Sequence, residues 1–255
     1  MNIKSFVIII VIILINVACS KKDEKTSVIT EKNLELQVLE AYREGMEALE
    51  SGDVLFAAKK FNEAEILYPQ SLWAPRASLM SAYSYYSGSY YANTIDELKR
   101  FINIYPKNNR LSYAYYLLAM SYYEQISDEK KDLQPLLNAK EKINFFVNKY
   151  PDSEYTLDLK FKSDLIENQL AAKELYIAKY YISVQKWVPA LNRLKIIVKD
   201  FDKTVFIEEA LHRLVEINYY LGLEEEAKKY AKILGYNYNS SEWFEQSYKI
   251  LNKDY

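Results

Sequence analysis

The sequence contains very few of the residues on which metal sites and most nucleophilic active sites depend. Its 255 residues include one Cys, one His, five Gly and six Pro. A single Cys and a single His leave little material for a zinc site or for a Cys/His or Ser/His catalytic pair. The shortage of Gly argues against phosphate-binding loops and arrays of β-hairpins, because both need residues that adopt positive φ. The composition therefore predicts an all-α chain that is not an enzyme.

The charges nearly cancel, since 33 Lys and Arg face 35 Asp and Glu, for a net charge of −2. Proteins that bind nucleic acid draw affinity from neutralising phosphates, so this balance gives no reason to expect a nucleic-acid partner. The residue in excess is Tyr, which occurs 25 times. It stands among many Leu, Ile, Lys and Glu, a background that favours helices.

The first 18 residues have the layout of a secretory signal peptide, with Lys4 before the unbroken apolar run 6–15. A helix of that length spans only ~15 Å, which is too short to cross a bilayer. The small residue Ala18 before Cys19 resembles the bacterial lipoprotein signal, in which the cysteine is acylated, although Asn16 stands where that signal prefers Leu. The alternative is an incidental thiol beside an ordinary cleavage site.

We therefore predict a signal peptide over residues 1–18 and a covalent lipid on Cys19. Ser20 follows the cysteine in place of the Asp that resembles an inner-membrane retention signal, so the outer membrane is the expected location. Residues 19–33 are mostly polar and charged and lack aromatic side chains, as in a flexible tether. With Cys19 acylated, no disulfide can form and packing alone must hold the fold.

Aromatic–proline pairs punctuate the rest of the chain at 68–69, 105–106 and 150–151, and 201–202 is a degenerate copy. Small and large apolar residues precede each pair at the offsets of the roughly 34-residue tetratricopeptide repeat. Before Pro69 these residues are Gly45, Ala48, Gly52, Ala57, Phe61 and Ala64. Small residues let the two helices of a hairpin cross closely, large ones fill the space between hairpins, and Pro ends the second helix.

We therefore predict an α-solenoid of about five tetratricopeptide-like hairpins, or about ten helices, over residues 34–255. The expected repeats cover 37–70, 75–107, 111–151, 171–203 and 206–236, followed by a C-terminal helix. Residues 153–185 contain no Pro or Gly, which predicts a long helix between the third and fourth repeats. The charged stretch 127–132 predicts a loop within an insertion at 127–135. No long linker follows residue 33, so a single continuous domain is expected.

Several phrases match one family of repeat proteins more specifically than the repeat alone; they lie at 68–77, 170–181, 186–193, 208–216, 221–223 and 234–243. At these residues the chain resembles the BamD (YfiO) family of outer-membrane lipoproteins, which belong to the β-barrel assembly machinery. The resemblance implies a scaffold without cofactors, apart from the lipid on Cys19, on the periplasmic face of the outer membrane. The implied partners are the POTRA domains of the barrel-forming subunit, other assembly lipoproteins, unfolded outer-membrane proteins and the membrane lipid.

The resemblance also places candidate contact residues. It puts Asn192 and Arg193 on the side that meets the POTRA domains, where a guanidinium suits a partner carboxylate. The alternative for Arg193 is an ion pair within the chain. For a client strand in a groove of the amino-terminal repeats, the best candidates are Tyr86, Tyr90, Tyr113 and Tyr116. The alternative for any one tyrosine is a place in the core, which we expect for Tyr85, Tyr91, Tyr122 and Tyr181.

The remaining candidates have ordinary interpretations. His212 has no second His or Cys near it in the sequence and is not expected to bind metal. Lys99, Arg100, Lys107 and Arg110 form a basic cluster that is expected to be surface charge, and the alternative is a contact with an acidic segment or with lipid headgroups. Two other functions stay open at this point: a periplasmic repeat adaptor for peptidoglycan or cell-division proteins, and an enzyme carried on a helical superhelix. The latter needs a catalytic domain for which the repeats leave no room.

Overall fold

The computed structural model describes residues 31–126 and 133–252, with side chains from residue 34. Within these ranges the chain forms eleven α-helices and no strand. The helices are α2 (Glu31–Glu50), α3 (Val54–Leu67), α4 (Ala74–Ser87), α5 (Tyr91–Ile104), α6 (Leu111–Tyr123), α7 (Gln134–Lys149), α8 (Thr156–Ser183), α9 (Trp187–Asp200), α10 (Ile207–Tyr220), α11 (Glu224–Asn237) and α12 (Glu242–Leu251). The prediction of an all-α fold is confirmed.

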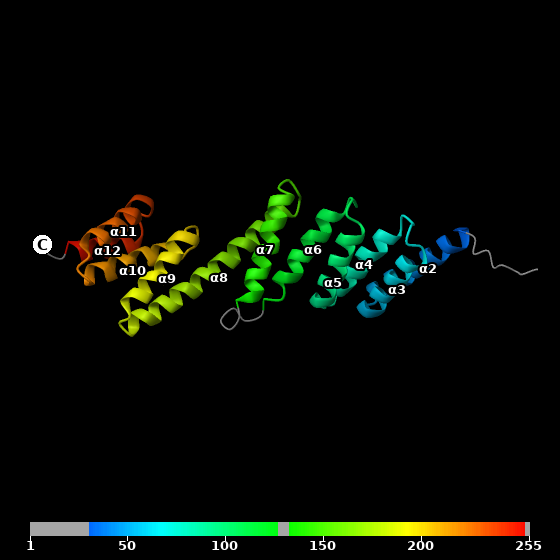
Figure 1. Cartoon of the computed structure of the whole chain (residues 1–255), viewed down its shortest axis with the longest axis horizontal. Helices are drawn as coiled ribbons and strands as arrows, with labels where there is room; N and C mark the ends of the chain where they lie inside the picture. The colour runs from blue at the N-terminus through cyan, green and yellow to red at the C-terminus, as the bar shows by residue number, and fades with distance from the viewer. Residues whose placement is uncertain (1–30, 127–132, 253–255) are drawn as a thin grey trace, which may run out of the picture.

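Consecutive helices pack in pairs, and each pair is one hairpin of the repeat. The pairs are α2–α3, α4–α5, α6–α7, α8–α9 and α10–α11, and α12 packs against both helices of the last pair. The hairpins follow one another in a row, with α2 at one end of the molecule and α12 at the other (Figure 1). This arrangement is the predicted solenoid of five hairpins and a C-terminal helix.

The predicted repeat offsets coincide with the core of the first hairpin. Ala57, Phe61 and Ala64 on α3 are fully buried. Gly45 on α2 lies so close to the ring of Phe61 that an added Cβ atom would sit 2.9 Å from the ring atom Cε1. The small residue is therefore needed where α2 and α3 cross, as the sequence pattern predicts.

Each second helix of a hairpin ends at an aromatic residue. Tyr105 caps α5, and its backbone N–H donates to the carbonyl of Phe101 at 2.8 Å. The same place after α3, α7, α9 and α11 is taken by Tyr68, Tyr150, Phe201 and Tyr238. Proline follows Tyr68, Tyr105 and Tyr150, whereas Asp202 follows Phe201 and Asn239 follows Tyr238. Helices α9 and α11 therefore end without proline, and the aromatic residue marks the repeat boundary more consistently than the proline.

Helix α8 joins the two halves of the solenoid. It has 28 residues, Thr156–Ser183, and confirms the long helix predicted over 153–185. Its first half buries Leu159 and Ile166 in the core shared with α6 and α7. Its second half buries Leu175 and Ala178 in the core shared with α9, α10 and α11. Figure 1 shows α8 running obliquely between the two groups of helices.

Some sequence-based expectations differ from the structure or fall outside it. Helix α2 begins at Glu31, inside the segment 19–33 that was predicted as tether. The signal peptide 1–18, Cys19 and the charged stretch 127–132 lie outside the described residues. The four tyrosines expected in the core are half-buried. Of these, Tyr122 packs against the core of α6 and α7, and Tyr181 against that of α8 to α11.

Candidate functional site

A cluster of tyrosines lies on the face formed by the first helices of neighbouring repeats. Tyr113 and Tyr116 are three residues apart on α6, a spacing that puts both rings on one side of a helix. Tyr155, the residue before α8, contacts both of them. Its ring stacks on that of Tyr116, with centroids 4.4 Å apart and planes 19° apart. Its centroid is 5.8 Å from that of Tyr113.

The phenol groups of this cluster are held neutral. Burial is the main cause that raises the pKa of Tyr116, and the nearby carboxylate of Asp158 raises it further. The hydroxyl of Tyr116 donates a hydrogen bond to Oδ2 of Asp158 at 3.1 Å. Burial also raises the pKa values of Tyr86 and Tyr113 to about 12. At neutral pH the cluster therefore presents aromatic faces and uncharged hydroxyl groups.

A pocket of about 430 Å³ opens beside this cluster. Its lining comes from α4, from the start of α6 and from the residue before α8, and consists of Leu79, Met80, Tyr83, Arg110, Tyr113 and Tyr155. The one cationic side chain in this lining is the exposed Arg110. An apolar floor, phenol hydroxyl groups and one guanidinium together suit a short segment that carries an aromatic side chain and a carboxylate.

The structure brings together three of the four tyrosines predicted for a groove. Tyr86 lies close enough to contribute to the raised pKa values of Tyr113 and Tyr116. Tyr90, the residue before α5, is 42% exposed and its ring packs over Gly88 in the turn after α4. Tyr90 therefore belongs to a turn. Of the four predicted tyrosines, Tyr113 is the one in the lining of the pocket, and Tyr86 and Tyr116 lie beside it in the cluster.

Two residues of the site were missed from the sequence, Tyr83 and Tyr155. Tyr83 falls on the pocket side of α4 beside Leu79 and Met80, a helical spacing that a face-by-face analysis could have found. Tyr155 lies more than 30 residues from α6 along the sequence and reaches the cluster through the turn after Pro151. Nothing local in the sequence indicates that contact.

The other candidate surface lies where α9 packs on α8. Nη1 of Arg193 contacts both carboxylate oxygens of Glu174, at 3.0 and 3.3 Å. The side chain of Arg193 is 38% exposed and that of Glu174 is 16% exposed. Asn192, the preceding residue, is exposed. Arg193 thus makes the internal ion pair that was its alternative interpretation, and part of its side chain still faces solvent.

The chain matches a known protein family over most of its length. The model of the YfiO family, described as "Outer membrane lipoprotein", matches residues 35–234. The chain belongs to the YfiO family.

Two relatives are named "Outer membrane protein assembly factor BamD". The one from Rickettsia prowazekii is 34% identical over 243 residues, which cover 95% of this chain and 94% of that protein. The one from Caulobacter vibrioides is 37% identical over 235 residues, which cover 92% of this chain and 76% of that protein. A solved structure of Pseudomonas aeruginosa PilF aligns over 84% of this chain and 97% of its own, with a TM-score of 0.26 and 12% identity, a similarity too low to carry an argument.

The match to the YfiO family ends at residue 234, before α12 (Glu242–Leu251). His212 on α10 packs beneath this last helix, where its Nδ1 lies 2.9 Å from Oγ of Ser247 and its ring lies 5.2 Å from that of Trp243. Burial lowers the pKa of His212, so the neutral imidazole is favoured. The described residues of this YfiO-family chain contain no group of three or more His, Cys, Asp or Glu that could hold a metal ion.

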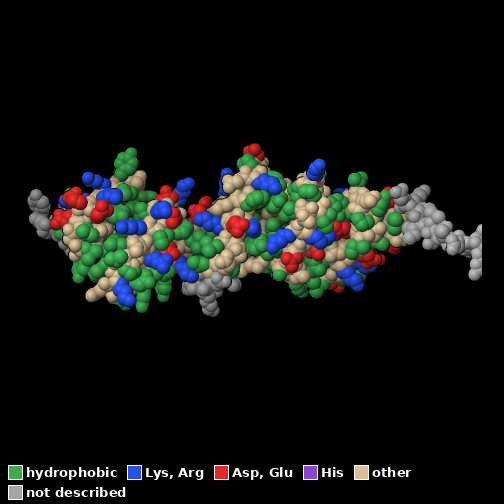
Figure 2. Space-filling view, viewed as in Figure 1, with side chains coloured by type: hydrophobic (Ala, Val, Ile, Leu, Met, Phe, Trp, Pro, Cys, Tyr) green, Lys and Arg blue, Asp and Glu red, His purple; other side chains and the backbone are tan. Residues whose placement is uncertain are grey.

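The basic cluster of Lys99, Arg100, Lys107 and Arg110 differs from its prediction at Arg100. Arg100 is not free surface charge, because Nη1 and Nη2 of its guanidinium contact Glu65 on α3 at 2.9 and 2.6 Å. Glu65 is 5% exposed and also accepts a hydrogen bond from the hydroxyl of Tyr105 at 2.8 Å. This ion pair joins the second helices of the first two repeats of the YfiO-family fold. Charged side chains of both signs are scattered among hydrophobic and other side chains on the visible face of the molecule (Figure 2).

No helix among the described residues is long and apolar enough to cross a membrane.

Proposed function

We propose that the chain is a lipid-anchored scaffold of the outer-membrane β-barrel assembly complex and makes or breaks no bond. Membership of the YfiO family and the names of the two relatives support this proposal. The observation that carries it is the separation of two surfaces on one row of hairpins. The tyrosine pocket lies in the second and third repeats, and the Arg193 surface lies in the fourth. Such a row can hold two partners at once.

In this proposal the tyrosine pocket receives segments of unfolded outer-membrane proteins. A membrane-facing β-strand exposes large apolar and aromatic side chains before it folds into a barrel. The rings of Tyr113 and Tyr155 offer aromatic faces to such side chains, and Arg110 offers a partner for a carboxylate. Because the phenols are neutral, an apolar segment can cover them without the desolvation cost of burying a charge.

At the other surface, Asn192 and Arg193 contact the POTRA region of the barrel-forming subunit. Glu174 orients the guanidinium of Arg193 through Nη1, while the exposed part of the side chain meets a carboxylate of the partner. A pre-oriented arginine loses less side-chain entropy on binding than a freely moving one.

The anchor is a lipid on Cys19. The eleven residues 20–30 separate Cys19 from the start of α2. Fully extended, that length of chain spans at most about 40 Å, so the start of α2 stays within about that distance of the lipid on Cys19. The tyrosine pocket lies in the second and third repeats, so along the row of hairpins it is nearer to the proposed anchor than the Arg193 surface is.

The test is co-purification of the full-length protein from membranes solubilised in mild detergent. Arg193→Glu places two carboxylates together and is expected to abolish association with a β-barrel protein that carries POTRA domains. The double variant Glu174→Arg/Arg193→Glu restores an internal ion pair but reverses the charge offered to the partner. Lys195→Glu, on the same helix and exposed, is the matched control and is expected to leave the association intact.

The three variants separate the possible outcomes. Loss of association in both Arg193→Glu and the double variant supports a direct contact. Recovery in the double variant would show that Arg193 acts only within the chain, and the assignment of the POTRA surface would be wrong. Peptidoglycan or cell-division proteins in place of a β-barrel partner would support the adaptor function instead.

A further inference from the structure

A second hollow lies on the other side of α6 from the tyrosine pocket. Tyr113 lines the tyrosine pocket, whereas Tyr115, two residues further along α6, lines this hollow. Two residues of an α-helix point about 200° apart, so the two sites occupy opposite faces of α6. We call this hollow the lysine trough; it is lined by Lys99, Ile102, Tyr115, Leu118, Lys142 and Phe145, with Asn103, Pro106 and Glu141 at its border.

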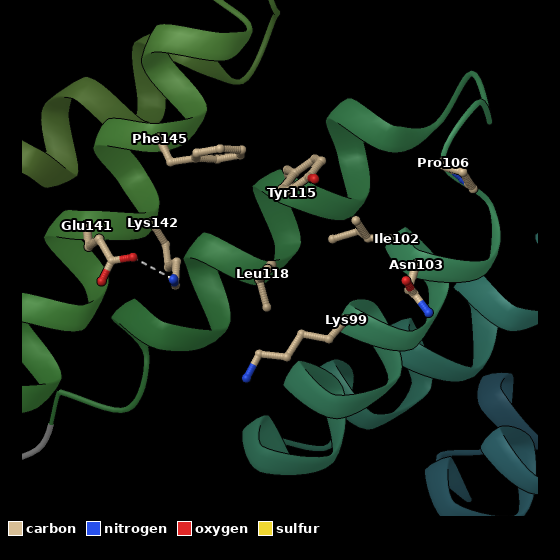
Figure 3. Close-up of a pocket in the computed structure, with 9 residues that line it drawn as sticks. All are labelled: Lys99, Ile102, Asn103, Pro106, Tyr115, Leu118, Glu141, Lys142 and Phe145. Carbon is tan, nitrogen blue, oxygen red and sulfur yellow. Dashed lines mark hydrogen bonds and ion pairs between the residues drawn. The ribbon is translucent and has the colours of Figure 1, made fainter.

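Three helices build the lysine trough (Figure 3). Tyr115 and Leu118 of α6 form its floor, with Ile102 of α5 on one side and Phe145 of α7 on the other. The volume is about 550 Å³, within the range of pockets that enclose a few side chains. Phe145 is 44% exposed although it is a large apolar residue. An exposed aromatic ring at the wall of an apolar hollow is a typical anchor point for a partner side chain.

Lysine side chains surround this apolar floor. Nζ of Lys149 lies 4.3 Å from the ring centroid of Tyr115 and 5.1 Å from that of Phe145. Nζ of Lys99 and Nζ of Lys142 lie 5.9 and 5.8 Å from the centroid of Tyr122. Lys99 and Lys142 line the trough, and Lys149 lies over two of its rings, so all three ammonium groups are at or beside the trough.

These cations exceed the carboxylates available to them. Lys142 pairs with Glu141, with Nζ and Oε1 2.7 Å apart. Among the described residues, no carboxylate forms an ion pair with Lys99 or Lys149, and both are exposed. The trough thus combines an apolar floor with two ammonium groups whose charge no carboxylate offsets.

We propose that the lysine trough binds an extended, acidic segment of a partner protein that carries an aromatic side chain. The ring enters between Ile102 and Phe145, and carboxylates on either side of it pair with Lys99 and Lys149. The chain's own residues 20–30 do not match this chemistry, because they carry three lysines and two acidic residues. This site goes beyond the proposed function and is independent of the tyrosine pocket.

The test uses full-length protein and a short fluorescein-labelled peptide that alternates aspartate with phenylalanine. A matched peptide that alternates lysine with phenylalanine controls for apolar binding alone. The double variant Lys99→Glu/Lys149→Glu replaces two attractive contacts with the carboxylates of the peptide by repulsive ones. It is expected to raise the Kd for the acidic peptide about tenfold. Phe145→Ala removes the apolar wall and is expected to raise it about fivefold. Lys195→Glu on α9, an exposed position outside both hollows, is expected to leave the Kd unchanged.

A direct map of the site makes the result independent of variant stability. A photo-reactive amino acid at Asn103, which is exposed at the border of the trough, is expected to cross-link the acidic peptide. The same group at Gln37, exposed on α2, is expected to give no cross-link. The milder variant Lys99→Gln/Lys149→Gln keeps the test valid if the charge reversal disturbs folding.

Several results would overturn the proposal. One is equal affinity for the acidic and the lysine peptide, and another is an unchanged Kd in both the double lysine variant and Phe145→Ala. Cross-linking from Gln37 and not from Asn103 would place the peptide elsewhere. Binding of phosphatidylglycerol vesicles that depends on Lys99 and Lys149, without binding of the acidic peptide, would identify the trough as a lipid contact.

Discussion

The ion pair between Glu65 and Arg100 is expected to hold the first repeat against the second. The two residues lie on α3 and α5, and Nη2 of Arg100 also contacts Oγ of Ser78 on α4 at 3.1 Å. Glu65 accepts hydrogen bonds from Arg100 and from the hydroxyl of Tyr105. Glu65→Ala removes these contacts and leaves the donors of Arg100 and Tyr105 facing a site that was 5% exposed.

The cost follows from this geometry. Removing one partner of a fully buried ion pair typically costs about 3–5 kcal/mol. Arg100 keeps its contact with Glu97 at 2.8 Å, and its side chain is 37% exposed, so water replaces part of what is lost. We therefore expect Glu65→Ala to lower the free energy of unfolding by about 2 kcal/mol. In a solenoid each repeat contacts only its neighbours, so the loss falls on the first two repeats.

Amide hydrogen exchange measured helix by helix tests this expectation. A loss of 2 kcal/mol speeds exchange through local opening by roughly thirtyfold, and we expect that change in α2 and α3. Helices α10 to α12 are expected to keep their rates. Glu40→Ala is the control, because Glu40 pairs with Arg43 at 4.0 Å while both side chains are more than 60% exposed. Equal exchange rates in α3 of the Glu65→Ala and Glu40→Ala proteins would show that the Glu65–Arg100 ion pair does not stabilise the first repeat.

Three further predictions test the core, the C-terminal helix and the pocket. Gly45→Ala presses a methyl group against Phe61. It is expected to lower the free energy of unfolding in urea by about 1 kcal/mol, even though Ala has the better helix propensity. Gln37→Ala, the control on the same helix, is expected to leave the free energy of unfolding unchanged. Burial lowers the pKa of His212 in the folded protein. The stability that the neutral imidazole contributes is therefore present above pH 6.5, the ordinary pKa of histidine, and is lost as the pH falls from 6.5 to the lower folded pKa. An NMR titration of this one histidine that gave a pKa of 6.5 or above would contradict this prediction. Tyr155→Ala removes the ring stacked on Tyr116 and is expected to reduce cross-linking of client segments to the pocket severalfold. Tyr176→Ala, at an exposed position in the second half of α8, serves as the control.

The repeat architecture could be predicted from the sequence because its causes are local and periodic. Gly45 and Phe61 fall on repeat offsets, and the structure brings them together where α2 crosses α3. The long α8 was predictable because residues 153–185 lack Pro and Gly. Residues 153–155, the first of the predicted stretch, form a turn and not part of α8. At this turn Oγ1 of Thr156 donates a hydrogen bond to the carbonyl of Tyr150 at 2.6 Å. Such side-chain hydrogen bonds at a helix start shift boundaries by a few residues.

The candidate sites were less predictable, because they depend on contacts between distant segments. Tyr155 joins the tyrosine cluster only because the turn after α7 folds over α6. Arg100 was expected in a surface cluster, since its partner Glu65 lies 35 residues earlier and on another helix. Tyr90 shares the composition of the cluster but belongs to the turn before α5. A run of tyrosines in the sequence therefore indicates a region, and packing decides which rings form the site.

A scaffold for β-barrel assembly must be bound to the barrel-forming protein in the membrane, and this binding is what the proposed function of the YfiO-family chain requires. The most direct test is to purify the tagged, full-length protein from outer membranes in mild detergent and to identify by mass spectrometry what accompanies it. We expect a stoichiometric β-barrel protein with POTRA domains. Recovery of wall-synthesis or division proteins, with no such β-barrel partner, would contradict it.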